Sequence, residues 1–210
     1  MFGQQEENNS SDTSLTINKH SFRIKTTDIN KESILLTVTC DLKTILADTL
    51  IEDGYNGIDF IDLNKDKNLD ILTSYIGNNG IYFLYLFDPA SNTFKNLDGF
   101  EKYPDAVQLK TNGKYYYSYH RAGCADANWV SDLFTIKDFK TIQIGHIYGQ
   151  GCDSDIKEDP QVIEIYKVIN DDEGKGELIE KLPYLKNIPV FGAKWNFIEK
   201  YWNKNFTKFE

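Results

Sequence analysis

The sequence predicts a mainly β protein with antiparallel sheets in a propeller-like or sandwich arrangement and one short C-terminal helix. Aromatic residues make up 14% of the 210 residues, including 13 Tyr and 13 Phe. Such rings favour the pleated, half-buried surface of a sheet. Short apolar or alternating segments recur about every ten residues, with Asn, Asp and Gly between them, a spacing typical of all-β domains.

Several segments have the length and periodicity of strands. They are residues 21–27, 33–39, 58–63, 69–75, 81–87, 107–110, 114–120, 129–136, 141–148 and 161–168. Near the C-terminus the pattern changes, because Trp195, Ile198 and Trp202 recur at helical spacing. This spacing predicts a short helix that packs on a sheet.

Composition limits the organisation and the partners of the chain. With 40% hydrophobic and 26% charged residues, we expect one β-rich domain over residues 15–210, after a polar, disordered lead-in at residues 1–14. The net charge of −9 disfavours binding to nucleic acid or anionic lipid. No segment has the roughly 20 apolar residues of a membrane-spanning helix.

The most informative segment joins two of the predicted strands. Asp62, Asn64 and Asp66 stand at alternate positions of a turn, the carbonyl of Asn68 follows at position 7, and Asp70 closes the series at position 9. Calcium prefers six to eight oxygen ligands, and alternate positions of a tight loop can converge on one ion. The segment predicts a calcium site made of these five residues.

Two positions set this loop apart from a helix–loop–helix calcium site. Lys67 stands where such loops usually have Gly, and Thr73 stands where an EF-hand needs a bidentate Glu. The flanking segments also read as strands, so the loop is not an EF-hand. A solvated Asp/Asn-rich turn that binds no metal is the alternative.

The loop and its flanks resemble the strand–loop–strand unit of FG-GAP/VCBS-type proteins, in which an Asp-rich calcium loop joins two strands of a propeller-like blade. Residues 58–66 and 70–72 carry this resemblance. The continuation at residues 82–89 and 93–94, with Gly123-Cys124 and Trp129, resembles a narrower set of small exported bacterial proteins.

Some proteins of that narrower set are similar to inhibitors of, or immunity proteins against, peptidoglycan hydrolases. The resemblance therefore implies an exported protein that binds a cell-wall hydrolase. It spans roughly residues 33–148, and the loop is its only specific motif. No inhibitory residue carries over, since no inhibitor motif matches.

The three cysteines bear on the compartment. If the hairpin of residues 129–148 turns near Asp138, Val130 and Phe134 share an apolar face with residues of the second strand, and Cys124 and Cys152 fall opposite each other. A disulfide needs this proximity and implies an oxidising compartment. Two buried free thiols are the alternative, and Cys40 is expected to be unpaired and buried in its strand.

No pattern points to catalysis. His20, His120 and His146 show no ligand pairing, and nothing places Ser118 beside His120 as an activated nucleophile. Tyr residues 115–117 are expected to cover a sheet core.

We therefore expect a non-enzymatic, periplasmic or secreted calcium-binding protein whose signal peptide has been removed and which binds another protein. A carbohydrate-binding module that uses exposed aromatics is the alternative, and a calcium-supported hydrolase is a third hypothesis. Because the first residues are polar, a cytoplasmic location is the alternative to export.

Overall fold

The computed structural model describes residues 11–17, 20–152, 161–169 and 176–210. The chain packs as two compact units, one of residues 1–77 and 83–96 and the other of residues 78–82 and 97–210. This division is finer than the single β-rich domain predicted over residues 15–210, which stays a prediction. Within the described residues, no helix is long and apolar enough to cross a membrane.

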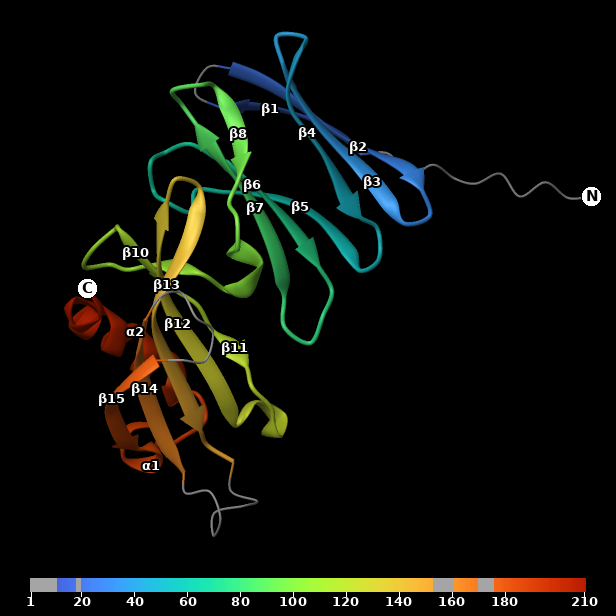
Figure 1. Cartoon of the computed structure of the whole chain (residues 1–210). Helices are drawn as coiled ribbons and strands as arrows, with labels where there is room; N and C mark the ends of the chain where they lie inside the picture. Colours follow the sequence, from blue (N-terminus) through green and yellow to red (C-terminus); the bar gives the residue numbers. More distant parts are fainter. Residues whose placement is uncertain (1–10, 18–19, 153–160, 170–175) are drawn as a thin grey trace, which may run out of the picture. The chain divides into compact units, whose positions relative to one another are not determined.

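Unit 1 contains two antiparallel sheets of four strands (Figure 1). The first sheet has the order β1 (Asp12–Ile17), β2 (His20–Asn30), β3 (Ser33–Cys40) and β4 (Lys43–Ile51). The second has the order β5 (Tyr55–Ile61), β6 (Asp70–Tyr75), β7 (Ile81–Asp88) and β8 (Thr93–Asn96), and the boundary between the units falls within β7.

The predicted disordered lead-in, residues 1–14, extends too far along the chain. Asp12–Ser14 belong to β1, where they pair with Lys25, Ile24 and Arg23 of β2. The Arg23 guanidinium also forms an ion pair with Asp12. These polar residues form a strand because the ladder satisfies their backbone groups whatever their side chains are. Residues 1–10 lie outside the described residues.

The core of unit 1 lies between its two sheets. Strand β3 alternates between half-buried and buried residues along its whole length, as a strand with one core face requires. Phe22 of β2 makes edge-to-face contacts with Phe87 of β7 and Phe94 of β8. The two sheets thus share one apolar cluster, as in a sandwich.

Unit 2 is built on one larger antiparallel sheet. Its strands, in spatial order, are β15 (Gly176–Pro183), β14 (Val162–Val168), β13 (Lys140–Gln150), β12 (Asn128–Lys137), β10 (Tyr115–Tyr117) and β9 (Val107–Gln108), and β11 (His120–Arg121) pairs with β12. Helices α1 (Tyr184–Asn187) and α2 (Ala193–Asn205) follow, and 3₁₀ turns occupy Phe100–Lys102, Cys124–Asp126 and Phe206–Phe209.

Helix α2 covers one face of this sheet (Figure 1). Trp202 is fully buried, and its Nε1 donates a hydrogen bond to Ser131 Oγ of β12 at 2.8 Å. Trp129 lies in the same cluster against Gly149 of β13, where a Cβ atom would come within 2.1 Å of the indole. The opposite face carries polar and aromatic side chains: Asp132 lies there, and the fully buried Phe134 stacks with Tyr103 and Tyr116.

The predicted fold class is confirmed: the chain is mainly β with antiparallel sheets and one short C-terminal helix at α2. Strands β1, β4, β8 and β15 were not predicted. Strand β4 has no regular alternation because most of its residues are exposed, so it lacks the periodicity that reveals a core-facing strand.

Candidate functional site

The predicted calcium loop lies between β5 and β6, and its side chains turn inward. The Asp62 carboxylate accepts hydrogen bonds from the backbone amides of Asp66 and Lys67, each at 3.0 Å. Asn64 Oδ1 accepts from the Asp66 amide at 3.2 Å, and Asn64 Nδ2 donates to Asp66 Oδ2 at 2.9 Å. The structure thus brings Asp62, Asn64 and Asp66 together.

Asp70 closes the loop from a fully buried position at the start of β6. Its two carboxylate oxygens accept hydrogen bonds from the amides of Leu63 at 3.1 Å and Phe87 at 3.0 Å. Burial raises the pKa of Asp70 to about 6, and the charges of Asp66 and Asp62 add to this shift although the two amides oppose it. A cation beside this carboxylate would favour its ionised form.

Lys67 and Thr73, the two positions that differ from an EF-hand loop, each have a defined place in the structure. Lys67 is exposed and has a left-handed backbone with φ of 72°, so it makes the turn for which such loops usually use Gly. Thr73 is buried in β6, where its hydroxyl donates to the carbonyl oxygen of Phe83 at 3.4 Å. Because strands flank the loop and Thr73 lies outside it, the EF-hand reading is excluded.

The residues of the loop fit a hard dication. The loop supplies the oxygen ligands that calcium prefers, namely the side-chain amide of Asn64 and the carboxylates of Asp62, Asp66 and Asp70. The backbone N–H of Asn68 donates a hydrogen bond to Asp66 Oδ1 at 2.8 Å, so Asn68 lies inside the same turn. Asp62, Asn64, Asp66, Asn68 and Asp70 would hold the ion.

Cys124 and Cys152 form a disulfide with a Cα–Cα distance of 5.8 Å. The hairpin turns near Asp138 as predicted, but its register does not place Cys124 directly opposite Cys152. The turn lies at Asp138 and Phe139, which both have positive φ, and the ladder pairs Asn128 with Gln150 and Val130 with Tyr148. The bridge forms beyond this ladder, where the 3₁₀ turn at Cys124 brings the chain back toward the end of β13.

Cys40 is the remaining free thiol and is buried, as predicted. Burial, followed by the charge of Asp41, raises the pKa of this thiol, which keeps it in the less reactive neutral form.

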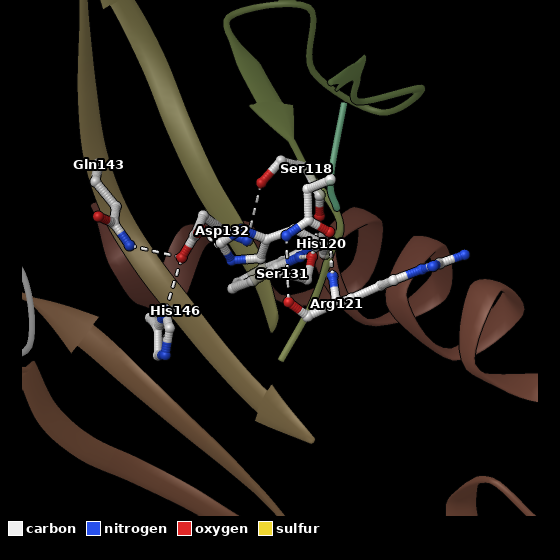
Figure 2. Close-up of polar contacts among 9 residues, drawn as sticks. Ser118, His120, Arg121, Ser131, Asp132, Gln143 and His146 are labelled. Carbon is white, nitrogen blue, oxygen red and sulfur yellow. Dashed lines mark hydrogen bonds and ion pairs between the residues drawn. The ribbon is translucent and has the colours of Figure 1, made fainter. Parts of the chain in front are cut away.

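A polar cluster on the face of the unit 2 sheet opposite α2 was not predicted from the sequence. Asp132 of β12 is 5% exposed. Its Oδ1 accepts hydrogen bonds from Gln143 Nε2 and His146 Nδ1, each at 2.7 Å, and His120 Nε2 of β11 lies 3.8 Å from its Oδ2. Figure 2 shows the side chains of β13 pointing at this carboxylate.

A β-bulge explains why no periodicity revealed the cluster. Residues three apart on a regular strand point to opposite faces, yet Gln143 and His146 both bond to Asp132. The register shifts between Leu133 and Phe134, so that Leu133 pairs with Gly145 and Phe134 pairs with Gln143. The extra residue in β13 returns both polar side chains to one face.

The cluster lies in a cavity of about 520 Å³. Ile81, Tyr103, Pro104 and Val130 are the apolar and aromatic residues of its wall. Burial lowers the pKa of His120, partly offset by the charge of Asp132. The cavity therefore combines the Asp132 carboxylate with apolar and aromatic walls that also carry Glu101 and Lys102, and it can accept a basic or hydrogen-bond-donating group.

Ser118 and the tyrosine run have structural places in unit 2. Ser118 is fully buried, and its hydroxyl accepts a hydrogen bond from the Asp132 amide at 3.4 Å, which does not leave it as an exposed nucleophile. Tyr115 and Tyr116 are at most 4% exposed, so this part of the run covers the core as predicted. It does not supply the exposed aromatics that a glycan-binding module needs.

Comparison with known proteins supports the fold alone. No family model and no curated protein matches the chain. A solved structure described as a Xanthomonas type IV secretion system related protein is similar over 85% of this chain and 96% of its own, with a TM-score of 0.50 and 17% identity. A subtype N11 neuraminidase-like protein of A/flat-faced bat/Peru (H18N11) matches over 76% of this chain and 56% of its own, with a TM-score of 0.30 and 12% identity.

Proposed function

We propose that this chain is a non-enzymatic, exported protein that binds another protein, and that its Asp62–Asp70 loop holds a structural calcium ion. The leading partner is a bacterial peptidoglycan hydrolase, so the chain would act as an inhibitor or immunity-type protein. The observation that carries the calcium part is the convergence of Asp62, Asn64 and Asp66 beside the buried Asp70.

The calcium ion would act as a brace. Asp70 accepts hydrogen bonds from Leu63, at the start of the loop that follows β5, and from Phe87 of β7. An ion held by Asp70 and the turn would therefore fix three strands of one sheet. It would also favour the ionised form of Asp70, whose pKa is raised by burial and, to a smaller extent, by the charges of Asp66 and Asp62.

The disulfide and the secretion setting of a similar fold support export. A disulfide such as Cys124–Cys152 persists mainly in oxidising compartments. The Xanthomonas protein of similar fold is described as related to a type IV secretion system. We infer from this description that the present chain is also exported by a bacterium.

The cavity around Asp132 is the surface we assign to the partner. The net charge of −9 favours a basic partner through electrostatic steering. A Lys or Arg side chain has an apolar stem and a charged head. The stem would contact the walls at Tyr103 and Val130, and the head would approach Asp132.

Calorimetry in the presence and absence of calcium tests the brace. A ligand present at a hundredfold excess over its Kd stabilises the folded state by about 2.7 kcal/mol, so millimolar calcium should raise the Tm relative to EDTA. Asp66→Ala should abolish this increase. Asp59→Asn, an exposed acid of β5 outside the loop, is the matched control and should retain it. An unchanged Tm in the wild-type protein would refute calcium binding.

Binding and inhibition assays against a panel of basic cell-wall hydrolases test the partner. We expect stoichiometric inhibition that weakens with salt, since screening reduces steering. Asp132→Asn should weaken it, and Asp138→Asn, at the exposed tip of the same hairpin, should not. Absence of both binding and inhibition across the panel would overturn the assignment of a hydrolase partner. It would not affect the calcium proposal, which calorimetry tests separately.

A further inference from the structure

Three metal-ligating side chains that are not part of the calcium loop lie together in unit 1. The ligand atoms of His20, Cys40 and Asp41 all lie within 4.8 Å of one another. Cys40 Sγ is 3.8 Å from Asp41 Oδ2. We propose that His20, Cys40 and Asp41 bind a divalent transition-metal ion of borderline softness, zinc above all.

Local backbone geometry creates this cluster. Neighbouring residues of a strand point to opposite faces, so Cys40 and Asp41 would normally diverge. Here Asp41 and Leu42 form the two-residue turn between β3 and β4 with φ of 48° and 66°, the conformation of a tight hairpin turn. The turn brings the Asp41 carboxylate back beside the Cys40 thiol.

The neighbouring strand supplies the imidazole. Phe22 of β2 pairs with Cys40 of β3, and His20 stands two residues before Phe22, on the same face of the strand. The rings of His20 and Phe22 are 6.3 Å apart. His20 therefore reaches the end of the hairpin next to the thiol.

The donor set indicates which ion fits. Thiolate, imidazole and carboxylate are all zinc ligands, with bonds of about 2.0–2.3 Å, and a tetrahedral ion leaves roughly 3.3–3.8 Å between ligand atoms. The Cys40–Asp41 distance already meets this range. His20 and Asp41 are exposed, so rotation of their side chains can bring the third ligand in.

The cluster differs in chemistry from the calcium loop. The loop offers oxygen atoms alone, which suit calcium, whereas a sulfur ligand selects softer metals. On binding, the ion takes the place of the thiol proton, which leaves to solvent. Three protein ligands leave the fourth tetrahedral position to water or another group.

Titration with cobalt(II), the probe ion, tests the site in the intact, disulfide-bonded chain without added thiols. Calcium is present in excess so that it fills the loop. A near-ultraviolet thiolate-to-cobalt charge-transfer band should develop and saturate at one ion per chain, and zinc should remove it. Because Cys124 and Cys152 are bridged, the band can arise only from Cys40.

Variants distinguish the cluster from a lone reactive thiol. His20→Ala and Asp41→Ala change exposed residues and should each weaken cobalt binding at least tenfold, since the loss of even an outer-shell partner costs about 10- to 100-fold. Cys40→Ser should abolish the band, and Asp66→Ala should leave it unchanged. No band in the wild-type protein, or unchanged affinity in both His20→Ala and Asp41→Ala, would overturn the proposal.

Discussion

His146 Nδ1 lies 2.7 Å from Asp132 Oδ1 across neighbouring strands of the unit 2 sheet. An ionised carboxylate can only accept a hydrogen bond, so the imidazole donates to it through Nδ1. His120 approaches the second oxygen of the same carboxylate from β11. One buried acid therefore contacts two imidazoles.

Asp132→Asn should lower the pKa of His120 further than burial already does. The Asp132 charge favours the protonated imidazole and partly offsets desolvation, so its removal leaves desolvation unopposed. Titration of the imidazole signals by NMR measures the change. Asp138→Asn serves as the control and should leave the His120 pKa unaltered. A His120 pKa that rises in Asp132→Asn would contradict the prediction.

His120 should also make the protein less stable as the pH falls. Its pKa in the folded state is below the ordinary value of 6.5, so below pH 6.5 the unfolded chain binds the proton more readily than the folded chain. The stability contributed by the neutral imidazole is present above pH 6.5 and is lost as the pH falls toward the folded pKa. His120→Gln should reduce this dependence in urea denaturation measured at several pH values. An identical pH dependence in the two proteins would count against the assigned shift.

Lys194 of α2 should be a strong stabilising residue of unit 2. Its side chain is fully buried, and its Nζ lies 3.0 Å from Asp126 Oδ2 and 3.8 Å from the centre of the Phe191 ring. Lys194→Ala would leave Asp126 without this cation, and breaking a buried pair costs about 3–5 kcal/mol.

Urea denaturation measures this loss against a control on the same helix. Lys200→Ala removes an exposed lysine and should change stability by less than about 0.5 kcal/mol. Lys194→Met keeps much of the side-chain volume, so it should lose less than Lys194→Ala. Equal effects of Lys194→Ala and Lys200→Ala would show that the ion pair contributes nothing.

Lys67→Gly should stabilise unit 1. Lys67 has φ of 72°, a conformation that costs a residue with a side chain about 1–2 kcal/mol. The greater chain entropy of Gly in the unfolded state offsets roughly 0.5–1 kcal/mol of this, so a gain of up to about 1.5 kcal/mol in the free energy of unfolding is expected.

The comparison for this substitution is Lys31→Gly. Lys31 is exposed in the turn between β2 and β3 and does not have a positive φ, so the same change should destabilise slightly. Thermal unfolding of both variants in EDTA measures the difference without any contribution from calcium. A loss of stability in Lys67→Gly would refute the strain at this position.

The fold class, most of the strands, the C-terminal helix and the loop that begins at Asp62 could be predicted from the sequence. These features depend on local rules: periodicity reveals which face of an element is buried, and alternate positions of a short turn fix which oxygens can converge. The strands that were not predicted, such as β4, are partly exposed and have no such periodicity.

Tertiary structure alone decided the register of the β12–β13 hairpin and the clusters that depend on it or on strand pairing. A bulge brings Gln143 and His146 to Asp132, and a turn with positive φ brings Asp41 beside Cys40. One inserted or left-handed residue redirects every side chain after it. Side chains far apart in the sequence therefore meet through backbone geometry that their spacing does not encode.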